Sequence, residues 1–179
     1  MKFLNLRKIK IKELAGFIIE YLKKHGVKAI LVGGSCVSIY TKNKYQSYDL
    51  DLVTYSELDE LETILGKIGF RRTGRLFEHS DCPYILDFVA PPVSIGGENP
   101  ITVYNTIKSK RGSIILLTPT DCVKDRLAAY LYWNDPQSLE QAILVARDNR
   151  INWNDIRNWL REEGFSDKYQ IIKARLMKK

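Results

Sequence analysis

Apolar residues recur along the first two thirds of the chain at spacings that alternate between those of helices and those of strands. Between residues 11 and 24 they return every three or four positions, which predicts a helix, and His25-Gly26 provides its end. The same reasoning predicts further helices over residues 35–41 and 57–68, and strands over residues 27–32, 48–54, 70–78, 84–90 and 114–117. We expect the stretch over residues 70–78 to be an edge or hairpin strand. Helices and strands that alternate in this way predict an α/β core.

The last third of the chain carries helical patterns only. Thr118-Pro119-Thr120-Asp121 combines a capping residue, a proline in the first turn and an early acidic residue, which is typical of a helix start. Three further helical stretches follow, divided at Pro136, Asn149 and Gly164. Residues 93–112 are predicted to form a long loop with at most a short hairpin. We therefore predict two regions, an α/β core over residues 1–117 and a helical layer over residues 118–179.

The composition is that of a folded, basic protein. The chain has 179 residues, of which 45% are hydrophobic, and this is enough for a buried core. Its formal net charge of +7 favours anionic partners such as nucleotides or nucleic acids. The three cysteines lack the spacing of a disulfide framework or a zinc site, and there is neither a signal peptide nor an apolar stretch of membrane-spanning length. These features predict a cytoplasmic protein without a membrane partner.

Three aspartates stand in otherwise apolar strands. Asp49 and Asp51 flank Leu50, and Asp87 lies in the middle of the predicted strand over residues 84–90. Because successive side chains of a strand point to opposite faces, Asp49 and Asp51 share a face, roughly 6 to 7 Å apart. If Asp87 lies on a neighbouring strand, the three carboxylates are expected to hold two hard cations about 3.5 to 4 Å apart. Such a pair of cations activates a hydroxyl and stabilises a departing pyrophosphate.

Gly33, Gly34 and Ser35 follow an apolar strand and predict a seat for a phosphate. Glycine lets backbone N–H groups approach an anion, and a serine at a helix start adds a hydroxyl and a favourable dipole. The spacing is neither that of a Walker loop nor that of a dinucleotide fingerprint. Each feature also has an ordinary structural explanation. A Gly-Gly turn commonly joins a strand to a helix, an Asp pair at a strand edge is often only solvated charge, and a single Asp such as Asp87 can cap a neighbouring loop. Their order, with each one attached to an apolar strand, favours a functional site.

In this order the residues resemble the DNA polymerase beta-like nucleotidyltransferase superfamily, which has a Gly-[Gly/Ser] turn, an Asp-x-[Asp/Glu] pair on the next strand and a later Asp. Residues 118–127 are similar to the helix start of a small bacterial and archaeal branch that includes abortive-infection-type toxins and minimal nucleotidyltransferases. The resemblance covers roughly residues 27–145. It implies a mixed sheet flanked by helices, and the metal-dependent transfer of a nucleoside monophosphate from an NTP to an acceptor hydroxyl.

The resemblance also implies roles for individual residues. Two Mg²⁺ ions, or Mn²⁺, would be held by the catalytic residues Asp49, Asp51 and Asp87, and the last of these would help to deprotonate the acceptor. The nucleotide would be held by Gly33, Gly34, Ser35, Ser47, Lys124 and Arg126. Relatives often carry an arginine two positions before the residue that corresponds to Ser47. This chain has Tyr45 there, and the neighbouring Lys44 is a substitute without the planar fork of arginine.

The sequence leaves the acceptor open. A tRNA end fits the basic charge and a toxin of a toxin–antitoxin system, a partner-protein hydroxyl fits the minimal nucleotidyltransferases, and a small-molecule hydroxyl fits antibiotic-modifying relatives. Six basic residues are candidates for an RNA track or for a solvated strand edge: Arg71, Arg72, Arg75, Lys108, Lys110 and Arg111. The rival hypothesis is a non-catalytic module with the same fold that binds a nucleotide or a partner. The oligomeric state is not indicated.

Overall fold

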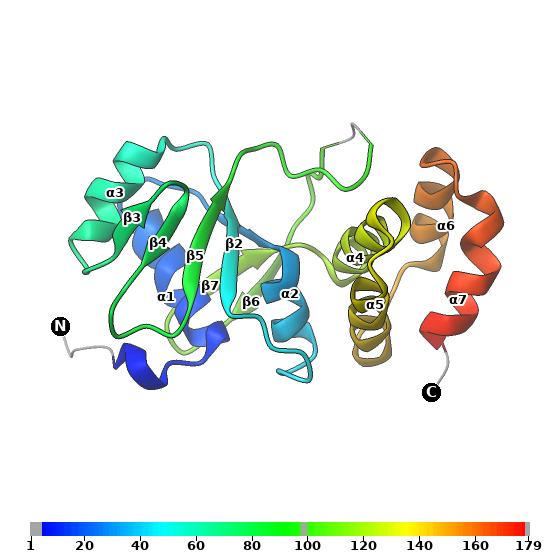
Figure 1. Ribbon diagram of the computed structural model, residues 1–179, viewed down its shortest axis with the longest axis horizontal. Coiled ribbons are helices and arrows are strands. Elements are labelled where there is room, and N and C mark those ends of the chain that lie inside the picture. Colours follow the sequence, from blue (N-terminus) through cyan, green and yellow to red (C-terminus); the bar gives the residue numbers. More distant parts are fainter. Residues whose placement is uncertain (1–4, 98–99, 178–179) are drawn as a thin grey trace. The chain divides into compact units, whose positions relative to one another are not determined.

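The computed structural model describes residues 5–97 and 100–177 (Figure 1). The chain folds into two compact units, each made of several segments. The first unit consists of Met1–Ser35, Ser47–Pro91 and Thr106–Leu116. The second unit consists of Cys36–Gln46, Pro92–Asn105 and Leu117–Lys179. The division into an α/β core and a helical layer at residue 117 stays a prediction.

The seven-stranded sheet is mixed, and its strands run in the order β3-β4-β5-β2-β1-β7-β6. The pairs β1–β7 and β2–β5 are parallel, whereas β1–β2, β3–β4 and β4–β5 are antiparallel. The strands are β1 Ile30–Val32, β2 Asp49–Val53, β3 Arg71–Thr73, β4 Leu76–Glu78, β5 Ile85–Val89, β6 Asn105–Lys108 and β7 Ser113–Leu116. The predicted α/β class and the mixed sheet are therefore confirmed.

Helices α1 (Ile11–Lys24) and α3 (Leu58–Gly66) pack on this sheet, α1 against β7 and α3 against β3 (Figure 1). The predicted bounds of α1 are confirmed. Its apolar stripe is fully buried, since Leu14, Ile18 and Leu22 are each 0% exposed. Burial of such a side chain stabilises the fold by about 1.5–3 kcal/mol. A short turn of 3₁₀-helix, η1 (Leu6–Lys8), precedes α1.

The second unit is built on helices with strong N-caps. Thr118 and Asn152 accept hydrogen bonds from backbone N–H groups in the first turns of α4 and α6, as does Asp135 in α5. The helices are α4 Pro119–Trp133, α5 Pro136–Asp148, α6 Trp153–Glu162 and α7 Tyr169–Met177, with the 3₁₀-helix η2 Ser166–Lys168 before α7. Helix α4 packs against α5 and α6, and α5 packs against α7. Of the helices described, none combines the length and apolar character needed to cross a membrane.

Several element bounds differ from those predicted. Strand β1 begins at Ile30 because the chain first closes α1, where the N–H of Val27 donates to the carbonyl of Leu22 and Gly26 has φ 83°. The stretch over residues 70–78 is a hairpin, since Gly74 adopts φ 64° between β3 and β4. Strand β6 lies inside the predicted loop. Helix α2 (Gly33–Tyr40) begins at the first glycine, directly after β1.

Candidate functional site

The three predicted aspartates lie on two adjacent strands of the first unit. Asp51 and Asp87 are register partners on the parallel strands β2 and β5, so their Cβ atoms lie on the same face, roughly 5 Å apart. Asp49 lies two residues before Asp51 and shares that face, whereas Leu50 and Leu52 point the other way and are 0% exposed. Asp87 thus lies on the strand next to the Asp49–Asp51 pair, which was the condition set for the three carboxylates to converge.

The carboxylates of Asp49 and Asp87 contact neighbouring side chains. The hydroxyl of Ser47 lies within hydrogen-bond reach of the carbonyl oxygen of Asp49, at 3.2 Å, and donates to its Oδ1. Oδ1 of Asp87 forms an ion pair with Nε of Arg75 at 2.9 Å, but it is buried and accepts no well-aligned hydrogen bond. Across residues 5–97 and 100–177, no three His, Cys, Asp or Glu side chains are grouped so as to hold a metal ion. The aspartates share a face without forming a ready set of ligands.

The residues nevertheless fit a hard divalent cation in their chemistry and placement. Carboxylate oxygens are the ligands that Mg²⁺ prefers, and three carboxylates side by side repel one another unless a cation neutralises them. The Oδ1 atom of Asp87 is a buried acceptor whose hydrogen-bonding capacity is not met. The two strands place the Cβ atoms of all three residues on one face of the sheet. Metal binding stays a prediction.

Both the backbone conformation and the neighbouring side chain favour glycine at position 33. The φ of Gly33, at 64°, lies in the left-handed region, and a Cβ at this position would lie 2.0 Å from Oδ2 and 2.8 Å from Cγ of Asp51. This close approach arises because Val32, the last residue of β1, is the register partner of Asp51. Gly33 therefore leaves room for the second carboxylate of the pair. That role was not part of the phosphate-binding prediction.

The other residues predicted near the phosphates are more enclosed. Ser35 is 0% exposed, and its hydroxyl donates to the carbonyl of Val32 at 2.9 Å. Ser47 is also buried, and its hydroxyl holds Asp49 as described above. Gly34 is half-buried and is the more accessible residue of the turn. A role for Gly33, Gly34, Ser35 and Ser47 in holding a nucleotide stays a prediction.

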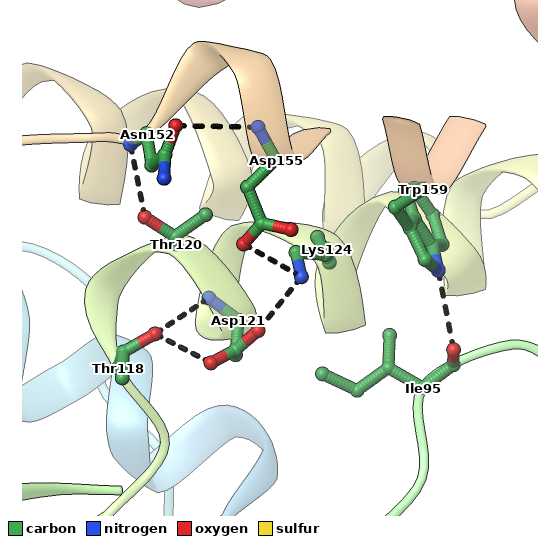
Figure 2. Close-up of polar contacts among 8 residues, drawn as sticks. All are labelled: Ile95, Thr118, Thr120, Asp121, Lys124, Asn152, Asp155 and Trp159. Atoms are coloured by element: carbon green, nitrogen blue, oxygen red, sulfur yellow. Dashed lines mark hydrogen bonds and ion pairs between the residues drawn. The ribbon is translucent and has the colours of Figure 1, made fainter. Parts of the chain in front are cut away.

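Lys124, predicted to bind the triphosphate, lies in a polar cluster of the second unit (Figure 2). Its Nζ atom lies 2.9 Å from Oδ1 of Asp121 and 2.9 Å from Oδ2 of Asp155, and the residue is 7% exposed. Burial by itself lowers the pKa of Lys124, but hydrogen bonds to Asp155 and Asp121 outweigh this and hold the pKa above its ordinary value. In this structure Lys124 joins α4 to α6.

The same cluster joins the N-caps of these two helices (Figure 2). Thr118 accepts a hydrogen bond from the N–H of Asp121 at 3.1 Å. The hydroxyl of Thr120 accepts from the N–H of Asn152 at 3.0 Å, and Asn152 in turn accepts from the N–H of Asp155 at 3.2 Å. Each residue that holds Lys124 is thus itself held at a helix start. The sequence analysis found the start of α4 and a helical stretch after Asn149, but not the contact between the two helices.

Arg126 and Lys44, the other cations considered for the triphosphate, also have partners in the second unit. Nη2 of Arg126 lies 2.6 Å from Oδ2 of Asp125, and its Nη1 donates to Gln141 at 3.3 Å. Nζ of Lys44 lies 2.8 Å from Oδ1 of Asp148. Their proposed contact with a nucleotide stays a prediction.

Comparison with known proteins relates the fold to nucleotide-transferring enzymes. No family model matches the sequence, and no curated protein matches it. An antigenic nucleotidyltransferase-like protein from Paracoccidioides brasiliensis matches the structure with a TM-score of 0.60 at 11% identity, over 92% of each chain. The chain has a nucleotidyltransferase-like fold.

Two further solved proteins share this nucleotidyltransferase-like fold. The lincosamide antibiotic adenylyltransferase LnuA, solved with lincomycin bound, matches with a TM-score of 0.57 at 15% identity, over 79% of this chain and 99% of its own. The antibiotic-resistance factor ANT(2″)-Ia matches with a TM-score of 0.54 at 15% identity, over 92% and 95%. At such identities the likeness establishes the fold. It does not single out the minimal or toxin-like branch.

The sequence analysis did not place Arg75 beside the three aspartates, although its side chain contacts Asp87. Arg75 follows Gly74 in the β3–β4 hairpin, and the next residue, Leu76, is the register partner of Asp87. The signal available in the sequence was the glycine between two short strand-like stretches, which indicates a hairpin. The pairing of that hairpin with β5 is a tertiary contact that this signal does not contain.

The basic residues considered for an RNA track lie far apart on the sheet. Arg71 and Arg72 belong to β3 and Lys108 to β6, and these two strands are the opposite edges of the sheet. Six inter-strand spacings separate them, roughly 29 Å. Arg72 is moreover bound to Asp59 and Glu62. The strand order therefore spreads these residues across the width of the sheet, and the choice between an RNA track and a solvated strand edge stays open.

Proposed function

We propose that this protein transfers a nucleoside monophosphate from an NTP to an acceptor hydroxyl in a reaction that depends on Mg²⁺ or Mn²⁺. The observation that carries the proposal is the register of β2 and β5, in which Asp51 faces Asp87 and Asp49 shares their face. The glycine turn that begins α2 is adjacent, since Gly33 touches the carboxylate of Asp51. The fold supports the proposal, because LnuA is an antibiotic adenylyltransferase with a similar structure.

In this proposal each residue has a separate task. Asp49, Asp51 and Asp87 would hold the two cations, which when bound neutralise the charge that develops on the phosphates. Ser47 fixes the carboxylate of Asp49 by its hydrogen bond. The backbone N–H groups at the start of α2 favour an anionic phosphate beside Gly34. Asp87, the most buried of the three aspartates, is the proposed acceptor of the proton from the attacking hydroxyl.

We propose a small hydroxyl compound as the acceptor class to test first. Two structural neighbours were solved with antibiotic ligands, lincomycin in LnuA and adenylyl-2″-tobramycin in ANT(2″)-Ia. The basic residues considered for RNA binding are divided between the two ends of the sheet and are not gathered in one place. A tRNA end and a partner protein, as expected of a toxin–antitoxin component, remain the other two classes.

Incubation with each α-labelled NTP, Mg²⁺ and a cell lysate containing tRNA tests the activity. The expected result is label on one acceptor class with the wild-type protein and none with the Asp49→Ala/Asp51→Ala variant. A matched control is Glu60→Gln, which removes an exposed charge from α3 and is expected to leave labelling unchanged. Separation into RNA, protein and small-molecule fractions identifies the acceptor. Equal labelling by the wild type and the double variant would contradict the proposal.

A non-catalytic module that binds a nucleotide or a partner is the second candidate. The observation that favours it is the ion pair of Arg75 with Asp87, which leaves the three carboxylates without a ready metal site. Thermal unfolding with NTP, in the presence and absence of Mg²⁺, separates the two. Stabilisation by NTP that needs Mg²⁺ and is lost in Asp49→Ala indicates the enzyme. Stabilisation that persists in Asp49→Ala, without any transfer of label, indicates the binding module.

A further inference from the structure

We propose that Arg75 occupies the cation position at Asp87 in the metal-free protein, so that a divalent cation binds there only after the guanidinium has left. The inference rests on the proposed function, because it concerns the same carboxylates. It assigns Arg75 a positioning role, which is to hold Asp87 in the metal-free state and to set how readily the site takes up metal.

The contact has the character of an exchangeable ion pair. Nε of Arg75 lies 2.9 Å from Oδ1 of Asp87, but the same oxygen accepts no hydrogen bond of normal geometry. The side chain of Asp87 is 12% exposed, whereas that of Arg75 is 62% exposed. The carboxylate is therefore fixed inside the sheet, and its partner reaches it from the solvent. An arginine that is already largely hydrated loses little on leaving.

The backbone of Arg75 is anchored, which confines the exchange to its side chain. The N–H of Phe88 donates to the carbonyl of Arg75 at 3.2 Å. Leu76, the next residue, is paired with Asp87 across β4 and β5. The guanidinium is therefore tethered close to the carboxylate in either position. Rotation of the side chain releases Asp87 without breaking the sheet.

Arg72, on the same hairpin, has more partners than Arg75 and is more enclosed. Its Nη1 lies 2.5 Å from Asp59 and 3.2 Å from Glu62, and its Nε donates to the carbonyl of Gly74 at 2.8 Å. Its side chain is 23% exposed. Three acceptors hold Arg72 in place, whereas Arg75 has one poorly aligned contact in the described structure.

Charge explains why a cation belongs in this place and why a divalent one displaces the arginine. Asp49, Asp51 and Asp87 carry three negative charges on one face, and Arg75 cancels one of them. A divalent cation offers twice the charge of the guanidinium and can bind more than one carboxylate. Arg75 and the metal compete for Oδ1 of Asp87, because the guanidinium and a cation cannot both lie against one buried oxygen.

Binding of Mn²⁺ to the metal-free protein, followed by the EPR signal of the free ion at fixed ionic strength, tests the inference. Arg75→Ala is expected to bind Mn²⁺ about two- to fivefold more tightly than the wild type, the upper part of the range for losing a partly exposed ion pair. Arg71→Ala removes the same charge from an exposed position on the hairpin and is expected to change the affinity less than about twofold. Arg75→Lys, which keeps the charge, is expected to fall between the wild type and Arg75→Ala.

A double-variant cycle with Asp87→Ala separates the contact from a general charge effect. In the Asp87→Ala background, Arg75→Ala is expected to bring no further gain in affinity. Equal gains in Arg75→Ala and Arg71→Ala, or a gain that persists without Asp87, overturn the inference. If Mn²⁺ binds and is lost in Asp49→Ala while Arg75→Ala behaves as the wild type, only this inference fails. If neither the wild type nor Arg75→Ala binds Mn²⁺, the proposed function fails with it.

Discussion

Replacement of Gly33 by alanine is expected to reduce nucleotidyl transfer by roughly 10–100-fold, the range for disturbing a residue that positions a metal ligand. The new Cβ would lie 2.0 Å from Oδ2 of Asp51, so the carboxylate has to rotate away from its place beside Asp87. The φ of 64° adds a cost of about 1–2 kcal/mol for a residue with a side chain. Transfer of label and Mn²⁺ binding measure the displacement of the Asp51 carboxylate, and denaturant unfolding measures the cost of the backbone strain.

Gly74→Ala is the matched control for the Gly33 variant. Gly74 has the same φ of 64°, but no atom lies within 4 Å of the position of a Cβ. It is expected to show the backbone cost alone, with Mn²⁺ binding and transfer unchanged. The Gly33→Ala/Asp51→Ala double variant is expected to recover the part of the stability that was lost to the clash, without recovering activity. If Gly33→Ala and Gly74→Ala behave alike, Asp51 does not require the glycine.

Replacement of Lys124 by methionine is expected to destabilise the second unit by about 2–4 kcal/mol. The change leaves the buried carboxylate of Asp121 without its cation, and breaking a buried pair from one side typically costs about 3–5 kcal/mol. The estimate is lowered because the second partner, Asp155, has a side chain that is 43% exposed and therefore partly screened by solvent. Urea unfolding followed by circular dichroism measures the loss.

Lys44→Met provides the comparison for the Lys124 variant. Lys44 lies 2.8 Å from Asp148, a distance like that of the Lys124 pairs, but its side chain is 57% exposed. Its loss is expected to cost less than about 1 kcal/mol. Similar losses for both lysines would show that burial does not set the strength of the Lys124 cluster. NTP binding measured on the folded variants tests the nucleotide role predicted for Lys124. That role is supported if Lys124→Met weakens NTP binding and Lys44→Met does not.

The pH dependence of stability gives a second readout for Lys124. Burial lowers the pKa of Lys124, but the hydrogen bonds to Asp155 and Asp121 outweigh this effect, so the pKa in the folded protein is raised. A raised folded pKa contributes stability that is fully present below the unfolded pKa of lysine and is lost as the pH rises through the folded value. The wild type is therefore expected to lose more stability than Lys124→Met over that alkaline range. Parallel losses in the two proteins would contradict this assignment.

The local pattern of the sequence determined much of the fold. Apolar spacing predicted the bounds of α1, and capping residues predicted the start of α4 at Thr118. The alternation around Leu50 placed Asp49 and Asp51 on one face. These features were predictable because helix and strand periods, and the hydrogen bonds of a helix cap, involve residues a few positions apart.

Only the tertiary structure decided which of these elements meet. It brought Asp87 opposite Asp51, set Arg75 against Asp87 and gave Lys124 a partner in Asp155. It also placed the basic strands β3 and β6 at opposite edges of the sheet. Each of these contacts joins segments far apart in the chain, and no period within one segment encodes the register or the strand order that creates them. The sequence by itself therefore determined the acidic residues and the glycine turn of the candidate site, while the packing of the sheet decided which charges surround them.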